Sequence, residues 1–342
     1  MEPTEPKRRQ LDSSAVTGLR ALGSLHVMSS HLAGFVSIRF ASLNLVGGAS
    51  IPIFFLASGF GLTLGYGAAG ARLKVVRFYL KRLAKLAPLF YLGNLLSFVL
   101  QSSHVRPHNW PSDYLPIRIL VSASFLSSWI PGFENPLFQT WTMSTIMGFY
   151  LCYPLVHQVL HPQRNMDQSP LAHALFALSV ALAGTMNVIL HSHVGDLGPL
   201  WFAGYGVVRS HPLLRLPVFM MGCCAAYECL RRQAAASTTG RQASKVGATV
   251  LLVSWLLLLC AAVVMSNVRL PFWPWTSDRW NWRADMVSAI WIRVLLEFVS
   301  PILLYHLIVA LCEPPFSHAS VQKHSAHHSR PVTLIACPCP QV

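Results

Sequence analysis

Long apolar runs, separated by short polar or basic segments, recur along almost the whole chain. A run of about 20 predominantly apolar residues forms a helix long enough to cross a lipid bilayer. The runs that this pattern predicts to contain helices are residues 15–36, 40–71, 86–100, 117–130, 141–156, 171–190, 197–208, 216–227, 247–266 and 286–311, where 40–71 holds one span with turns at both ends. Residues 117–130 fit either a tilted span or a re-entrant segment. Residues 216–227 are short for a span, and their helix either ends there or extends backward across Arg215 or forward across Glu228. The pattern therefore predicts an all-α, polytopic transmembrane helix bundle with about 10 hydrophobic segments.

Basic segments indicate which ends of these helices face the cytoplasm. Residues 72–85 contain six Lys or Arg and no acidic residue, and residues 231–245 contain four and no acidic residue. Short loops rich in Lys and Arg stay on the cytoplasmic side of a membrane. We therefore expect a cytoplasmic N-terminus and C-terminal tail, with the tryptophan-rich residues 267–285 on the opposite side. This arrangement requires an even number of crossings, about eight or ten.

The chain divides by composition into three parts. Residues 1–14 form a polar, basic tail, and residues 15–312 form the predicted transmembrane domain. No clear cleavage site follows the first apolar run, so we expect that run to be retained as the insertion signal. Residues 313–342 are rich in Pro, His and Ser without periodicity, which predicts disorder. The His and Cys residues of this tail match no closed zinc-site spacing, so we expect no metal site there.

The composition excludes an ordinary soluble domain. The chain is 53% hydrophobic and only 11% charged, whereas soluble domains carry about 25% charged residues. Its formal net charge of +14 invites comparison with nucleic-acid-binding proteins, but the Lys and Arg residues gather in short segments beside apolar runs. Membrane topology explains that distribution. We therefore expect a multi-pass integral membrane protein whose partner is the lipid bilayer and not nucleic acid.

Two ionisable residues in the first apolar run, Arg20 and His31, are the leading candidates for a functional site. They are eleven residues apart, so they share one face of a helix. An ionisable group inside a membrane segment faces a bundle interior or a wet cavity. Arg20 and His31 are therefore predicted to line a polar channel, with His31 near its reactive end. The alternative is an arginine that reaches the interface and a histidine bonded to a neighbouring helix.

Arg82 and Lys85 are the basic residues that lie deepest at the entry to the third apolar run. They are three residues apart and therefore share a helix face. Arg and Lys pair well with phosphate, so these two residues are candidates for binding a phosphorylated donor. Contact with anionic lipids is the alternative explanation for the same charges.

Two further features are predicted to hold helices together. Arg293 and Glu297 lie four residues apart inside the last apolar run, which predicts a neutralising pair. Ser58 and Gly59 lie in the second apolar run. Small residues let membrane helices approach closely, so these two are predicted to pack and not to react.

Five separated segments form an ordered set of motifs. They read TGLRALGSLHVMSSH, GASIPIFFLASGFGLT, FYLKRLAKLAPLFYL, WTMSTIMGFYLCYPLV and LPVFMMGCCAA. The first has Arg and His separated by ten residues, the second contains Ser-Gly-Phe, and the third has two basic residues followed by Pro88. This set resembles the acyltransferase-3 family of multi-span membrane enzymes, which O-acylate sugars and other hydroxyl acceptors. The resemblance extends over residues 17–230 and more weakly to residue 311.

The resemblance implies an activity and roles for the candidate residues. The family passes an acyl group from cytoplasmic acyl-CoA to an acceptor hydroxyl, here on a carbohydrate or a lipid-linked molecule. His31 would be the general base of that reaction. Arg20, Arg82 and Lys85 would hold donor phosphates or stabilise developing negative charge. Acyl-CoA would be a co-substrate, and no other cofactor is expected.

Two departures from the family pattern keep other functions open. The family's Glu in the fourth motif is Ile146 here, and the match fades towards the C-terminus, which predicts a truncated or altered member. Either departure favours a catalytically inactive relative that acts as a membrane binding or scaffold protein. A transporter that uses His31 and Arg20 as a substrate or proton site is the remaining alternative. The absence of discernible inverted repeats counts against it.

Overall fold

The computed structural model describes residues 14–36, 50–67, 73–104, 115–130, 141–160, 166–192, 210–239, 247, 249–257 and 282–312. All structural statements below concern these residues. Their named helices are α1 (Ser14–Val36), α3 (Ile51–Gly67), α4 (Val75–His104), α5 (Leu115–Ala123), α6 (Trp141–Leu160), α7 (Ser169–Ser192), α10 (Pro212–Thr239) and α12 (Trp282–Leu311). No strand occurs in this described part, so the predicted all-α fold class is confirmed. The predictions for residues 1–13, for 313–342 and for most of 267–285 lie outside it.

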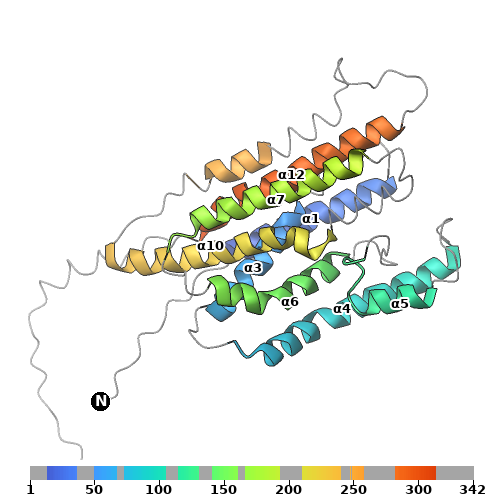
Figure 1. The fold of residues 1–342 in the computed structure, drawn as a ribbon, viewed down its shortest axis with the longest axis horizontal. Helices are drawn as coiled ribbons and strands as arrows, with labels where there is room; N and C mark the ends of the chain where they lie inside the picture. Colours follow the sequence, from blue (N-terminus) through green and yellow to red (C-terminus); the bar gives the residue numbers. More distant parts are fainter. Residues whose placement is uncertain are drawn as a thin grey trace, which may run out of the picture.

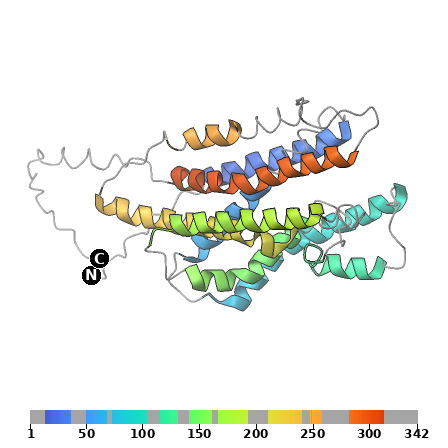
Figure 2. The same ribbon diagram turned by 45° about the horizontal axis from the view of Figure 1, so that its top comes forward.

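Helix α10 lies inside the bundle, in contact with α3, α6, α7 and α12. Helix α3 contacts α1, α6 and α12 as well as α10. Figure 1 shows α7 and α12 running side by side, with α4 and α5 at the opposite edge of the bundle. The second view shows α1 and α12 along one side, α4 to α6 along the other, and α7 and α10 between them (Figure 2). Helix α3 contacts both α1 and α6, and α6 contacts α4, so these four helices form a continuous series of neighbours.

Two helices in the described part are long and apolar enough to cross a membrane. They are Ser169–Met186 within α7 and Pro212–Gln233 within α10, while Ile51–Gly67 and Leu296–Leu311 are shorter apolar helices. Most of the α10 segment is buried by its neighbours, whereas most of the α7 segment is exposed. Exposed apolar side chains on a long helix are what contact with lipid requires. The number of crossings stays a prediction.

Helix α10 is longer than the apolar run 216–227 from which it was predicted. It continues through Arg215 at one end and Glu228 at the other, and both side chains are buried. Glu228 accepts hydrogen bonds from Arg231 and Arg232 of the same helix. The charged residues that bound the apolar run in the sequence therefore do not end the helix, because each is paired within the structure.

Helix α5 covers only part of the predicted segment 117–130. It is nine residues long, which corresponds to about 14 Å, well short of the roughly 30 Å of a hydrocarbon core. After Ala123 the chain turns, with Phe125 at a φ of 60°. Residues 124–130 then bond to α6, where the Ser128 hydroxyl donates to the Trp141 carbonyl at 2.8 Å. Residues 117–130 therefore do not form one straight span.

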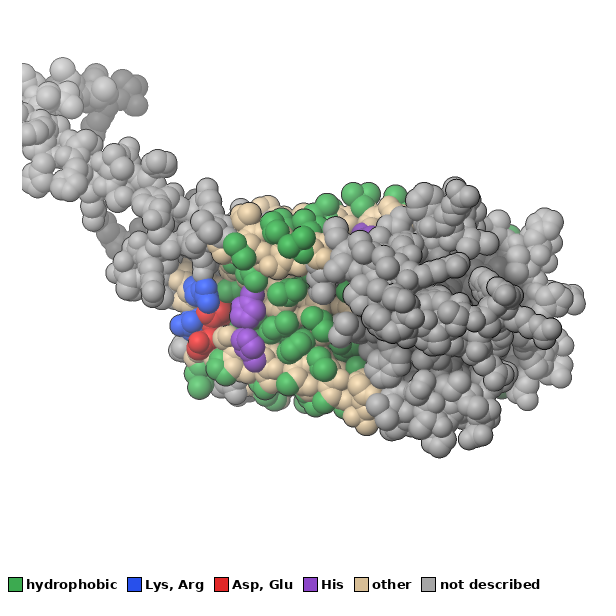
Figure 3. Space-filling view, turned by 90° about the horizontal axis from the view of Figure 1, so that it is seen from above, with side chains coloured by type: hydrophobic (Ala, Val, Ile, Leu, Met, Phe, Trp, Pro, Cys, Tyr) green, Lys and Arg blue, Asp and Glu red, His purple; other side chains and the backbone are tan. Residues whose placement is uncertain are grey.

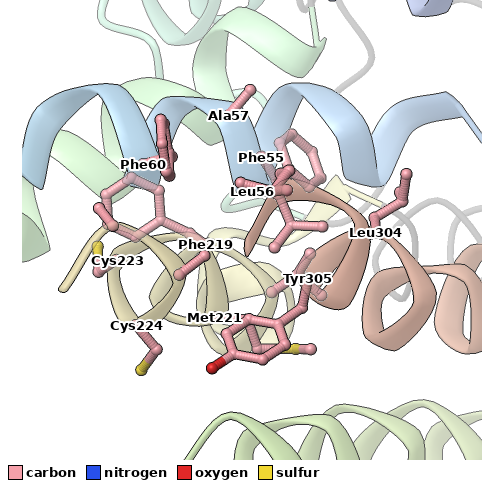
Figure 4. Close-up of a cluster of buried hydrophobic side chains, with 14 of the residues drawn as sticks. Phe55, Leu56, Ala57, Phe60, Phe219, Met221, Cys223, Cys224, Leu304 and Tyr305 are labelled. Carbon is pink, nitrogen blue, oxygen red and sulfur yellow. The ribbon is translucent and has the colours of Figure 1, made fainter. Parts of the chain in front are cut away.

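Helices α3 and α10 pack backbone against backbone at two glycines. A Cβ atom on Gly59 would lie 2.1 Å from the Phe219 carbonyl oxygen, and one on Gly222 would lie 2.0 Å from that of Leu56. No side chain fits at either distance, so only glycine permits this approach. Around this contact, buried side chains of α3 and α10 meet Leu304 and Tyr305 of α12 (Figure 4). The packing role predicted for Gly59 is confirmed.

A buried ion pair joins α10 to α12. The Arg215 guanidinium contacts the Glu297 carboxylate, with the two side chains 0% and 2% exposed. The Arg215 Cζ atom also lies 4.2 Å from the centroid of the Phe298 ring. Glu297 was predicted to pair with Arg293 of its own helix, and the structure instead gives it a partner on another helix. The Arg293 side chain lies outside what the structure describes.

Candidate functional site

A cluster of two arginines and two tyrosines, the Arg–Tyr cluster, lies where α1, α3, α4 and α6 meet. Its members are Arg20 of α1, Tyr66 of α3, Arg82 of α4 and Tyr150 of α6. The Arg82 Cζ atom lies 5.4 Å from the centroid of the Tyr66 ring and 5.7 Å from that of Tyr150. The Phe78 ring, one turn earlier on α4, lies 5.6 Å away. A guanidinium within about 6 Å of an aromatic ring gains cation–π stabilisation.

Arg20 approaches the same group of residues from α1. Its Nη2 donates a hydrogen bond to the Ala57 carbonyl oxygen of α3, and the side chain is half-buried. A Cβ atom on Gly61 would lie 3.6 Å from that Nη2, so the absence of a side chain at Gly61 leaves room beside it. Tyr150 interacts electrostatically with both Arg20 and Arg82. Two positive charges therefore converge on one tyrosine inside the bundle.

The Arg82 side chain has unused hydrogen-bonding capacity. Its Nε atom is buried and has no hydrogen-bond partner among the described residues. Aromatic rings offset part of the cost of burying a charge, but they do not accept the N–H group as an oxygen would. A buried guanidinium donor without an acceptor is a position where an anionic ligand atom gains a charge-assisted hydrogen bond.

The other two predicted site residues are Lys85 and His31. Lys85 lies one turn beyond Arg82 on α4, and its side chain is exposed. His31 lies within α1, a continuous helix through both Arg20 and His31, but its side chain is not described. The helical backbone places the two positions on one face, about 16 Å apart along the axis. His26 lies five residues before His31 and therefore on a different face of α1, where its Nδ1 hydrogen-bonds to the Ser50 hydroxyl.

Tyr66 and Tyr150 were not predicted as site residues. Tyr150 lies in the motif WTMSTIMGFYLCYPLV, yet a tyrosine in an apolar run gives no signal of its partners in sequence. Tyr153 of the same helix stacks on Phe78 with ring centroids 5.3 Å apart. The aromatic layer behind the Arg–Tyr cluster is therefore built by α4 and α6 together, which only the packing of helices reveals.

Ile146 lies one helical turn before Tyr150 on α6. It is half-buried and packs against the hydrophobic core. Residues four apart share a helix face, so a carboxylate at position 146 would lie on the side of α6 that carries Tyr150.

Ser144 and Thr145, which precede Ile146 in the motif, hydrogen-bond to other segments of the chain. Ser144 donates to the Phe125 carbonyl, and Thr145 Oγ1 lies 2.6 Å from the Ser210 carbonyl oxygen.

The helical fold and the Arg–Tyr cluster define an apolar helix bundle with a cationic site between its helices. The acyltransferase domain model of the acyltransferase-3 family matches residues 13–313, which is most of the chain. The protein belongs to this family, as the ordered motifs predicted, and acyl transfer is the general activity that membership supports. No curated protein and no solved structure matched the chain.

Proposed function

We propose that the protein transfers an acyl group from acyl-CoA to a hydroxyl group of a carbohydrate or lipid-linked acceptor. The observation that carries this proposal is that Arg20 and Arg82 both interact with Tyr150, and that the buried Arg82 Nε atom has no acceptor among the described residues. Coenzyme A carries several phosphate groups, and arginine is the side chain best suited to binding phosphate. An acyltransferase whose donor is acyl-CoA needs such a site.

The proposal gives donor binding and catalysis to different residues of the site. Arg82 binds a phosphate of the donor, and exposed Lys85 extends the positive potential towards the predicted cytoplasmic surface. Arg20, which lies near Tyr150 together with Arg82, binds the donor phosphates with it and leaves the thioester to extend along α1 towards His31. Its guanidinium acts in a water-poor interior, where an electrostatic contact is stronger than in water.

His31 acts as the general base in this scheme. Its imidazole takes the proton of the acceptor hydroxyl as the hydroxyl oxygen attacks the thioester carbonyl carbon. The tetrahedral intermediate carries its negative charge on the former carbonyl oxygen. When the intermediate collapses, the carbon–sulfur bond breaks, and the CoA thiolate leaves and takes up a proton. The products are the O-acylated acceptor and free CoA.

Transfer of a labelled acyl group from acyl-CoA in isolated membranes tests the proposal. We expect His31→Ala to lower the rate by about 10² to 10⁴ while the protein still inserts, because a general base typically contributes that factor. His26→Ala is the matched control, since His26 is bonded to Ser50 and is expected to matter much less. Equal rates for the wild type and His31→Ala would remove His31 from the chemistry.

A second function, donor binding without transfer, is favoured by the apolar packing of Ile146. The Ile146→Glu variant separates the two functions. A rise in acyl transfer in this variant would mean that the missing carboxylate is the defect and that the site is otherwise competent. If the wild type and Ile146→Glu are both inactive with every acceptor while acyl-CoA still binds, the inactive-relative function stands and catalysis is excluded.

A further inference from the structure

Two histidines from distant parts of the sequence meet on the surface of the bundle. They are His173, in the first turns of α7, and His306, near the end of α12. Their Nε2 atoms lie 3.4 Å apart, and their ring centroids are 5.2 Å apart. Figure 3 shows one face of the bundle, on which histidine side chains (purple) lie beside basic (blue) and acidic (red) side chains. The proposed acyl transfer gives this pair no role.

A hydrogen bond fixes which nitrogen of His173 is free. Its Nδ1 atom lies 2.6 Å from the Ser169 carbonyl oxygen. A carbonyl oxygen only accepts, so Nδ1 carries the hydrogen, and in a neutral imidazole the Nε2 atom then has an exposed lone pair. That lone pair faces His306. Metal-binding histidines are commonly oriented in this way, by donating their other ring N–H to a backbone carbonyl.

The separation of the two rings fits a shared metal ion. The Nε2–Nε2 distance of 3.4 Å is long for a hydrogen bond between the rings. Two imidazoles on one tetrahedral ion, at metal–nitrogen distances of about 2.05 Å, place their nitrogens about 3.4 Å apart and their ring centres about 5.2 Å apart. Both observed separations match this geometry.

We propose that His173 and His306 bind one divalent transition-metal ion of the Zn²⁺ type. Imidazole nitrogen is a preferred ligand of zinc, copper and nickel, whereas magnesium and calcium prefer oxygen. Among the described residues no group of three or more His, Cys, Asp or Glu gathers as a metal site. Water therefore fills the remaining positions of the ion in this proposal.

The charges near the pair permit a bound cation. Arg232 interacts electrostatically with His306, but Arg232 and Arg231 both donate to the buried Glu228 carboxylate. Arg231 also interacts with Asp167, so two carboxylates balance the two guanidinium groups. This carboxylate also lies 3.4 Å from the backbone nitrogen of Gln168, just before α7 begins. The site therefore lies at the end of the bundle where the basic segment 231–245 starts. Helices α7 and α12 both pack on α10, and a metal ion at this site would join α7 to α12.

Thermal unfolding of the purified, chelator-treated protein with and without Zn²⁺ tests the proposal. Binding to the folded state raises the melting temperature by mass action. The protein is prepared without a polyhistidine tag. The comparison is repeated in a background variant in which the histidines of the C-terminal tail are replaced by alanine. These are His318, His324, His327 and His328. We expect Zn²⁺ to raise the melting temperature in that background and Mg²⁺ not to do so.

Single variants in the same background identify the ligands. His173→Ala and His306→Ala should each lose the Zn²⁺-dependent shift and weaken Zn²⁺ binding at least about 10-fold, whereas His26→Ala should keep both. Co²⁺ in place of Zn²⁺ should give the visible absorption of a tetrahedral complex, and either ligand variant should abolish it. Unchanged Zn²⁺ binding in His173→Ala, or no binding in the background, would overturn the proposal and leave only a contact between neutral rings.

Discussion

Arg82 is the residue whose surroundings bear most directly on function. Three aromatic rings surround its guanidinium at 5.4 to 5.7 Å, and its buried Nε atom has no acceptor among the described residues. Rings of this kind hold an arginine in place without neutralising it. In the proposed function this fixed position suits the side chain to an anion, which an arginine serving only membrane topology does not need.

The first prediction compares Arg82 with an arginine on the same helix. Arg82→Gln should weaken acyl-CoA binding by about 10-fold or more, because a hydrogen bond to a charged group contributes about 1.5 to 3 kcal/mol. Exposed Arg77 is the matched control, and Arg77→Gln should bind acyl-CoA almost as the wild type does. Binding of labelled acyl-CoA to the purified protein, at low and high salt, measures both. Equal affinities for the two variants would assign Arg82 to topology alone.

At this scale the sequence allowed only part of the site to be predicted. Arg20 and Arg82 stand out because a charge inside or beside an apolar run is costly and therefore conspicuous. Tyr66 and Tyr150 do not stand out, because tyrosine is common in apolar helices and its partners come from other helices. The pairing of His173 with His306 was missed for the same reason, since 133 positions separate them.

At the scale of helices, the contact between α3 and α10 depends on two glycines that allow backbones to touch. Lipid tails are as apolar as the helices, so the hydrophobic effect does not drive membrane helices together. Close approach of the backbones stabilises the contact through van der Waals packing instead. The apolar pattern predicted where most helices lie because a long apolar run has few other stable structures in a membrane. It left the ends of α10 open, with an extension across Arg215 or Glu228 as one alternative, because buried charges that find partners look like helix ends in sequence.

The second prediction concerns this glycine contact. Gly59→Ala should lower the melting temperature in detergent, because its Cβ would collide with the Phe219 carbonyl and overpacking costs about 1 to 3 kcal/mol. Gly65→Ala, on the same helix, has nothing within 4 Å of the added Cβ and should be neutral or stabilising. Fluorescence-detected thermal unfolding compares the two variants. Equal melting temperatures would show that α3 and α10 are not this close.

The third prediction concerns the ion pair between α10 and α12. Glu297→Leu should destabilise the protein by about 3 to 5 kcal/mol, because it leaves the Arg215 charge buried without its carboxylate. The double variant Arg215→Met, Glu297→Leu should recover much of that loss, since apolar residues replace both charges. Yield of folded protein and its melting temperature provide the measurement. A double variant as unstable as the single one would mean that the two side chains are not coupled.

At the scale of the whole molecule, the described helices form one bundle in which α10 is surrounded by its neighbours. Helical class and family membership could be predicted from sequence, because composition and ordered motifs are properties of the chain as a whole. The number of crossings and their direction depend on the bilayer and remain predictions from the basic segments. The assembly of the site from α1, α3, α4 and α6 depends on long-range packing, which no local pattern encodes.

The fourth prediction concerns orientation. Residues 72–85 and 231–245 should face the cytoplasm, because short segments rich in Lys and Arg remain on the cytoplasmic side of the membrane. Residues 267–285 should face the opposite side. Lys74→Cys and Ser277→Cys on a cysteine-free background, treated with an impermeant thiol reagent, give the test. Only the cysteine at position 277 should react while the cytoplasmic face is closed to the reagent. Labelling at position 74 under that condition would reverse the topology.

The central claim is that the Arg–Tyr cluster binds the acyl donor. The most direct measurement is an experimental structure of the protein in a membrane mimetic with a non-hydrolysable acyl-CoA analogue. The account predicts a phosphate of the analogue within hydrogen-bonding distance of Arg82, and the carbonyl analogue on the face of α1 that carries Arg20 and His31. An analogue bound with its phosphates away from Arg82, or on the lipid-facing side of α4, would contradict it.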